Sequence, residues 1–313
     1  MSNRIVSLTH IAADTLPVFY SIGLIANILS IVIFSRRRFK KTIFETYFRF
    51  MSFTDLISLA YPINSYFIFR YDIETYDMSY LICSYLDFIQ FVFPATSAWL
   101  LTMISFDRMI IIVFPTHLTN FKKSSKFQYG YCVFALACSM IAYSPLFYYR
   151  EFNLYTNFNN QTNQTSSYYL CELKPGAGSV LWTDIFYGNI VPAVIMLILN
   201  IFTIKALFKS RFKASIDVSK RDIRFAITSF ALIIFFFLSS LFSQLYLLLF
   251  AYDYFETYEQ SLFWNTLACL TYTLYFSSMF FVNMIVNLMF REECLNILNE
   301  ITSFFIKKNI HSQ

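Results

Sequence analysis

The chain alternates between long apolar stretches and short polar segments. A helix needs about 20 apolar residues to cross the hydrocarbon core of a bilayer. The stretches are apolar all round rather than on one face, which is typical of helices embedded in lipid. The pattern predicts an all-α membrane protein with a seven-transmembrane helix bundle over 16–290, preceded by an N-terminal segment 1–15 and followed by 291–313. We expect the spans near 16–35, 46–69, 80–114, 127–149, 181–208, 222–252 and 260–289.

The composition supports this interpretation. Hydrophobic residues make up 57% of the 313 residues and charged residues only 14%, against about 25% charged in soluble domains. The chain has five glycines, which leaves little room for a glycine-rich phosphate loop. The first fifteen residues are polar, so we expect no cleavable signal peptide and predict that the first apolar stretch stays in the membrane.

Positive charge lies on one side of the predicted bundle. Of the 24 lysines and arginines, all but four lie in or beside the loops on the side of the membrane that carries the C-terminus. Positive residues gather on the cytoplasmic side of membrane helices, so the N-terminus is predicted outside the cell and the C-terminus in the cytoplasm, in the plasma membrane. The net charge of +5 follows from this topology and requires no nucleic-acid partner. The four basic residues on the other side are Arg4, Arg70, Arg150 and Lys174.

The longest predicted exterior loop carries two features of extracellular chemistry. The stretch NQTNQT at 160–165 contains two glycosylation sequons, at Asn160 and Asn163. Cys83 and Cys171 both fall at the exterior edge, where thiols can oxidise. A bridge between them would contribute roughly 4–5 kcal/mol in the chain-entropy account. The alternative is a pair of unbonded small residues at the membrane edge.

Polar side chains recur inside the predicted spans. Most of them can be explained by a hydrogen bond to a neighbouring helix, worth about 0.6 kcal/mol on average, or by a functional role. Asp55 is different, because an acid in hydrocarbon needs a partner, a proton or a cation. The candidates are Asn27, Asp55, Gln90, Ser97, Asn283 and Asn287.

After the last span, the sequence REECLNILNEITSFF predicts a short amphipathic helix lying in the membrane interface. Cys294 within it could be palmitoylated or could simply pack.

The sequence ISFDRMIIIVFP places Asp107 and Arg108 side by side near the end of the third span. Arg108 follows Cys83 by 25 residues, and Pro115 follows Arg108 by seven. This spacing resembles the third span and second inner loop of rhodopsin-like (class A) G-protein-coupled receptors. Asn27 and Asp55 resemble the family's first and second spans. The resemblance covers nearly the whole chain and is strongest to divergent invertebrate receptors of the peptide-receptor-like or chemosensory type.

The resemblance implies a switch at the inner end of the bundle. The family's arginine pairs locally in the inactive state and contacts the C-terminal helix of a heterotrimeric G protein in the active state. By resemblance Asp107 and Arg108 take these roles. Pro115 belongs to the same motif, and Asn283 and Asn287 lie where the family carries Asn-Pro-x-x-Tyr.

The resemblance also implies a polar cluster that can hold a sodium ion, formed by Asn27, Asp55, Ser97 and Asn283. Beyond this possible allosteric ion no cofactor is expected.

Three residues depart from the family's motifs. Met109 replaces the tyrosine after Asp-Arg, and Met284 and Asn287 replace the proline and tyrosine of the seventh span. A decoy receptor or a constitutively active one therefore stays open.

The predicted exterior surface is acidic, and its acids alternate with tyrosines in YDIETYD and YDYFETYE. Such a surface suits a cationic peptide, so an extracellular neuropeptide is the favoured ligand and a small chemosensory molecule the alternative. Gln90 stands where amine receptors carry an aspartate, which disfavours a monoamine. The predicted ligand-binding residues are Gln90, Asp87 and Glu172. No lysine occurs in the seventh span, so the chain does not form a retinal Schiff base.

Two other protein classes fit the sequence less well. Transporters show inverted repeats, and we find none; a ligand-gated channel is the related alternative. An intramembrane enzyme would need a catalytic or metal motif, but the three histidines, His10, His117 and His311, lie outside the predicted spans. We therefore predict a receptor with no catalytic residues and no metal-ligand set.

Overall fold

The structure is a computed structural model of the whole chain. It describes residues 2–39, 44–60, 66–67, 71, 79–113, 125–159, 164–174, 178–212, 220–251, 254 and 257–311.

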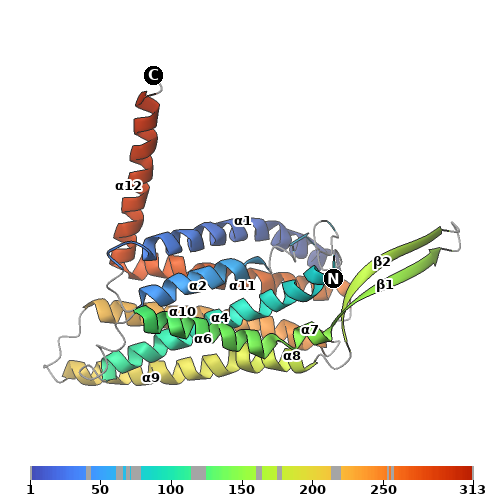
Figure 1. Cartoon of the computed structure of the whole chain (residues 1–313), viewed down its shortest axis with the longest axis horizontal. Helices are drawn as coiled ribbons and strands as arrows, with labels where there is room; N and C mark the ends of the chain where they lie inside the picture. The colour runs from blue at the N-terminus through green and yellow to red at the C-terminus, as the bar shows by residue number, and fades with distance from the viewer. Residues whose placement is uncertain are drawn as a thin grey trace.

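Long helices form a bundle in which neighbouring helices run along one another (Figure 1). The helix α4 is central, because it packs against α2, α6, η2, α9 and α10, while α11 joins α10 to α1. Residues 178–212 form one continuous helix, in which the short α-helix α8 leads into the wider π-helical turns of η2 and then into α9. The elements are α1 (Ser2–Phe34), α2 (Glu45–Ser58), α4 (Tyr80–Val113), α6 (Ser125–Tyr143), α8 (Gly178–Thr183), η2 (Asp184–Ile190), α9 (Val191–Phe212), α10 (Lys220–Ala251) and α11 (Tyr258–Val286).

Six helical segments of the described chain are long and apolar enough to cross a membrane. Large apolar side chains cover their outer faces; on α9, for example, Phe202 is 56% exposed and Val194 48% exposed. A soluble protein does not expose apolar surface on this scale, so these faces meet lipid. The six segments, which match six of the predicted spans, are Asp14–Phe34, Leu81–Val113, Lys126–Tyr149, Gly178–Ala206, Phe230–Leu249 and Gln260–Val286.

The remaining predicted span, 46–69, contains α2. The described helix ends at Ser58, and most of 61–69 lies outside the described residues. Inside the bundle, α2 buries an unusually polar set of side chains, among them Thr54 and Asp55.

An antiparallel β-hairpin leaves one end of the bundle, which was not expected from the sequence. It consists of β1 (Arg150–Asn159) and β2 (Gln164–Leu173), connected to α6 by the single turn α7 (Leu146–Tyr149). Figure 1 shows it projecting well past the helices. We call this end of the bundle the hairpin end.

The last helix, α12 (Leu288–His311), leaves the opposite end and lies across the direction of the bundle (Figure 1). We call this the α12 end. The predicted interfacial segment 291–313 therefore begins three residues early, and its 24-residue helix is about 36 Å long, not short. Leu295 and Leu298 are half exposed, whereas Cys294 and Ile297 are buried, so the helix is amphipathic, with one side packed on the bundle and apolar residues beside it left exposed.

A cluster of phenylalanines fixes α12 to the bundle. The ring of Phe34 lies 5.1 Å from that of Phe48 and 5.1 Å from that of Phe290, between centroids. Phe34 is the last residue of α1, Phe48 lies in the first turn of α2 and Phe290 lies in the first turn of α12. Aromatic packing therefore joins the ends of three helices. Cys294, 5% exposed, belongs to the same core, and its burial favours the packing role over palmitoylation.

Candidate functional site

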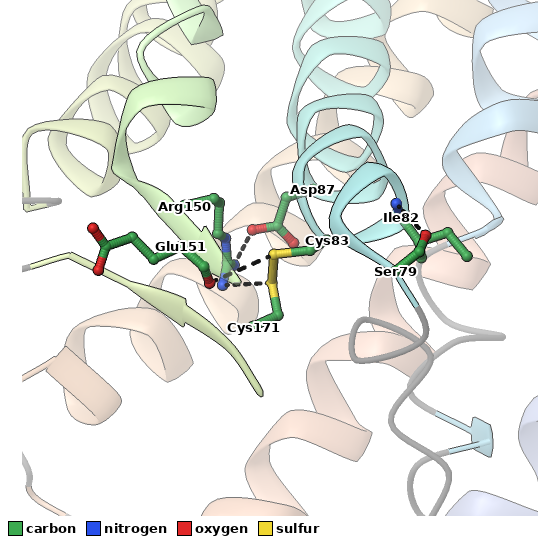
Figure 2. Close-up of a disulfide and its surroundings, with 7 residues drawn as sticks. All are labelled: Ser79, Ile82, Cys83, Asp87, Arg150, Glu151 and Cys171. Carbon is green, nitrogen blue, oxygen red and sulfur yellow. Dashed lines mark hydrogen bonds and ion pairs between the residues drawn. A yellow bond between two sulfur atoms is a disulfide. The ribbon is translucent and has the colours of Figure 1, made fainter. Parts of the chain in front are cut away.

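The hairpin end is tied to the bundle by a disulfide. Cys83, in the first turn of α4, is bonded to Cys171 of β2, with the two Cα atoms 5.7 Å apart. This confirms the pairing predicted from the exterior positions of the two cysteines. Ser79 caps α4 by accepting a hydrogen bond from the backbone of Ile82 at 3.2 Å, so the turn that presents Cys83 is itself fixed (Figure 2).

Beside the disulfide, Asp87 is occupied by the chain's own arginine. Arg150, the first residue of β1, forms an ion pair with Asp87, which lies one helical turn further along α4 than Cys83 (Figure 2). The same guanidinium contacts the sulfur of Cys171 at 3.8 Å. The side chains are only 15% and 5% exposed. Asp87 was predicted to bind ligand, but in this structure its charge is neutralised from within.

Two acids of the hairpin face each other and are stabilised by neighbouring side chains. Its register places Glu151 of β1 directly opposite Glu172 of β2, an arrangement that is destabilising by itself. Lys174 pairs with Glu151 at 3.1 Å, and the hydroxyl of Tyr155 donates to Glu172 at 2.7 Å. Glu172, another predicted ligand-binding residue, therefore lies on the half-buried hairpin rather than in the bundle.

Deeper in the bundle, α2, α4, η2, α10 and α11 enclose a cavity of about 60 Å³. Gln90 lines it, three residues further along α4 than Asp87, which is about 4.5 Å along the helix axis. The Asp87–Arg150 pair therefore lies between the disulfide and this cavity. The walls are Ser58, Gln90, Phe91, Pro94, Asp184, Ser243, Tyr246, Leu247, Tyr272 and Phe276.

The cavity contains a buried carboxylate that was not among the predicted site residues. Asp184, the first residue of η2, is 6% exposed. Its Oδ1 accepts a hydrogen bond from the hydroxyl of Tyr143 at 2.9 Å, and its Oδ2 accepts one from the Nε2 of Gln244 at 2.8 Å. Three helices thus meet at one acid. The signal was present in the sequence WTDIFYGNI, because an acid within an apolar span needs a partner for the same reason as Asp55.

The π-helical turn shapes the surroundings of Asp184. A π-helix brings residues five apart together, and Asn189 donates its Nδ2 to the backbone oxygen of Asp184 at 2.9 Å. Gly188 leaves the space that the network uses: a Cβ at this position would meet the hydroxyl of Tyr143 at 2.7 Å and Oδ1 of Asp184 at 2.9 Å. Single π-helical turns occur often at functional sites.

Two of the four predicted sodium-cluster residues come together. Ser97 of α4 donates to Oδ1 of Asp55 at 2.5 Å, and both are buried. Asn27 instead bonds across to α11, donating to the backbone oxygen of Phe276 at 2.9 Å and to that of Gly23 at 3.0 Å.

Asn283 forms its hydrogen bonds within its own part of the chain. It is seven residues beyond Phe276 on α11, about 10 Å nearer the α12 end, and its Nδ2 bonds to the oxygen of Met279 at 2.8 Å. A hard cation takes several oxygen ligands, and among the four predicted residues the described contacts join the carboxylate of Asp55 to the hydroxyl of Ser97. The sodium site therefore stays a prediction, and we derive no step through such an ion.

At the α12 end, Asp107 and Arg108 have separate neighbours. The hydroxyl of Tyr47 in α2 donates to Oδ2 of Asp107 at 3.0 Å. The guanidinium of Arg108 lies over the ring of Phe44, 5.0 Å from its centroid, and the residue is 4% exposed. Tyr47 and Phe44 were not predicted, because nothing in the local sequence shows which face of α2 meets the end of α4. Pro115 lies outside the described residues.

Asn287 forms the corner between α11 and α12. Its backbone leaves the helical region (φ −101°, ψ 98°), and its side-chain oxygen accepts a hydrogen bond from the backbone of Phe290 at 3.3 Å. Asparagine is a favoured N-terminal cap, so the residue that replaces the family's tyrosine has a structural use here. Its amide also contacts Oδ1 of Asn283 at 3.4 Å, which brings together two of the predicted switch residues.

Two further predictions concern glycosylation and metal binding. Asn160 and Asn163 lie outside the described residues. Within the described chain, no group of three or more His, Cys, Asp or Glu side chains is placed to hold a metal ion.

Comparison with known proteins agrees with this architecture. A comparison with curated proteins returned no match. The sequence profile of the family described as "7 transmembrane receptor (rhodopsin family)" matches residues 26–287, which includes the end of α1, the helices α2 to α11, the disulfide and the Asp107–Arg108 pair. The chain therefore belongs to the rhodopsin family of seven-transmembrane receptors.

Proposed function

We propose that this receptor binds an extracellular cationic peptide at the hairpin end and activates a heterotrimeric G protein at the α12 end. The observation that carries the coupling half is the packing around Arg108. A buried arginine whose guanidinium lies on the ring of Phe44 can reach a partner protein only if α2 and the end of α4 separate. The hydrogen bond from Tyr47 to Asp107 holds the same two helices together, so this end behaves as a latch.

The proposal of a peptide ligand rests on the size of the cavity and on the charge of the surrounding sequence. The cavity of about 60 Å³ is far below the roughly 300–1,000 Å³ of pockets that enclose a whole drug-sized ligand. It can hold only the tip of a ligand, and the rest would lie against the hairpin. A peptide has this shape, with one inserted side chain and an extended backbone outside. The acids and tyrosines of the sequence segments YDIETYD and YDYFETYE favour a cationic one.

A small chemosensory molecule is the second candidate. The observation in its favour is the polar lining of the cavity by Gln90, Asp184 and Ser243, which could hold a molecule of a few atoms without any contact to the hairpin.

The test is a screen in transfected cells, with second-messenger output and ionic current recorded from the same cells. We expect amidated peptides containing arginine or lysine to evoke second-messenger output without current. Arg108→Ala should abolish the response at normal surface expression. The matched control is Arg36→Ala, which removes an exposed ion pair with Glu300 at the same end and should leave the response intact, because exposed pairs contribute little. A response that survives Arg108→Ala, or a current that replaces the second messenger, contradicts the proposal.

The orientation is tested separately through the glycosylation sequons. With the hairpin end outside the cell, the receptor should carry N-linked glycan that an endoglycosidase removes, and the double substitution Asn160→Gln, Asn163→Gln should abolish that gel shift. Wild-type receptor that reaches the cell surface without glycan contradicts this assignment of the loop.

A further inference from the structure

Asp184 is a buried acid surrounded by neutral groups. Its hydrogen-bond donors are the hydroxyl of Tyr143, the amide of Gln244 and the amide of Asn189, the last at 3.4 Å. No lysine or arginine of the described chain forms an ion pair with it. Neutral donors stabilise a carboxylate but leave its charge uncompensated, and an uncompensated charge in a protein interior is costly.

The contrast with Asp87 is informative. Both acids lie toward the hairpin end, but Asp87 already has a cation, Arg150, supplied by the chain. A ligand cation gains nothing at Asp87 unless it first displaces Arg150. At Asp184 no such competitor is present among the described residues.

Asp184 also adjoins empty space. It lines the 60 Å³ cavity together with Gln90 and Tyr272, and it lines a smaller neighbouring cavity together with Asn189 and Ser239. The larger cavity has room for a few water molecules or for one small planar group.

The polar groups around the acid add acceptors. The Oε1 of Gln244 is buried and makes no hydrogen bond within the described chain, while Nε2 of the same amide donates to Asp184. A buried acceptor left without a donor costs about 1–3 kcal/mol. A planar cation with several N–H groups can donate to the carboxylate and to a neighbouring amide oxygen together, as a guanidinium does.

We propose that Asp184 binds the guanidinium group of an arginine side chain of the ligand. This inference rests on the proposed function and names the chemical group of the ligand that the receptor recognises. The Gly188 backbone leaves room for Tyr143 to hold the carboxylate, and Tyr272 and Gln90 provide the walls against which the flat group lies. Asp87 keeps its own cation, Arg150, and takes no part in the binding.

The experiment uses the purified full-length receptor in detergent and two small probes of equal size and shape, methylguanidinium and the neutral methylurea. Thermal unfolding is measured at millimolar concentrations of each. We expect methylguanidinium to raise the unfolding temperature and methylurea to leave it unchanged. Asp184→Asn should remove the shift, whereas the control Asp87→Asn should keep it. Asn is close in shape and its oxygen still accepts from Tyr143, so the variant is expected to fold.

Three outcomes overturn the proposal: equal shifts with both probes, a shift that persists in Asp184→Asn, or a shift that Asp87→Asn removes. If Asp184→Asn does not purify, Gln244→Leu replaces it and should weaken the methylguanidinium shift with no effect of methylurea; an unchanged shift is a negative result. In the cell assay, Asp184→Asn should weaken an arginine-containing peptide agonist about 30-fold or more, and replacing that arginine by citrulline should do the same. The probe binding is read without any G protein, so it can succeed even where the signalling proposal fails.

Discussion

Replacing Gly188 by alanine tests the Asp184 network most directly, because the substitution adds one methyl group at a known place. That carbon would lie 2.7 Å from the hydroxyl of Tyr143 and 2.9 Å from Oδ1 of Asp184, distances that neither group can keep. The hydrogen bond between them, 2.9 Å long, must therefore lengthen or break. The matched control is Gly130→Ala on α6, where a Cβ meets no heavy atom within 4 Å.

The expected magnitude follows from three contributions. A hydrogen bond between membrane helices is worth about 0.6 kcal/mol on average and up to about 1.7. Forcing an extra methyl group into a packed site costs roughly 1–3 kcal/mol. Alanine recovers up to about 1 kcal/mol relative to glycine within a helix. Gly188→Ala should lower the free energy of unfolding by about 1–3 kcal/mol, and Gly130→Ala should leave it unchanged or raise it slightly.

The assay is thermal unfolding of the detergent-purified receptor, followed with a thiol-reactive dye. Cys132 and Cys269 are buried free cysteines and react only when the bundle opens. Gly188→Ala should unfold several degrees below wild type, and the methylguanidinium shift should fall with it. If Gly188→Ala unfolds at or above the wild-type temperature while Gly130→Ala behaves as expected, the close approach of Tyr143, Asp184 and Gly188 is wrong.

Three further predictions concern the two ends of the bundle. Tyr47→Phe removes only the hydroxyl that donates to Asp107, so we expect a loss of about 0.5–1.7 kcal/mol and higher basal nucleotide exchange in isolated membranes; wild-type exchange would count against the latch. Asn287→Ala removes the cap of α12, which costs about 0.5–2 kcal/mol, and should speed thiol labelling of Cys294. Labelling of wild type should be slow at neutral pH and accelerate as the pH rises, because burial raises the pKa of the Cys294 thiol and so lowers its thiolate fraction. Equal labelling rates in wild type and Asn287→Ala would contradict the capping role. Replacing both cysteines of the disulfide by serine should lower stability by about 2–5 kcal/mol, read as the unfolding temperature, and an unchanged temperature would show that the Arg150 ion pair alone holds the hairpin.

Much of the fold could be predicted from the sequence, because a membrane imposes its constraints locally. A stretch of about 20 apolar residues is a span whatever its neighbours are, and six described segments match their predicted ranges closely. The β-hairpin was missed for the opposite reason: its strands lie in water, and their pairing depends on a register that the local pattern does not specify.

The candidate site was predicted less completely. Asp55 and Ser97 were expected together and are together. Asp184 followed the same rule as Asp55 and could have been found by it. The pairing of Asp87 with Arg150 could not, because it depends on where the hairpin folds back over α4.

The sequence by itself determined which segments enter the membrane and which residue types must find partners there, since the cost of burying a polar group does not depend on the details of the fold. The tertiary structure decided which partners they find. It gave Asp87 a cation, Asp184 three neutral donors beside an empty space, and Asp107 a tyrosine from another helix. These choices are set by helix rotation and depth, which fix the distances between side chains far apart in sequence and are not encoded in any single span.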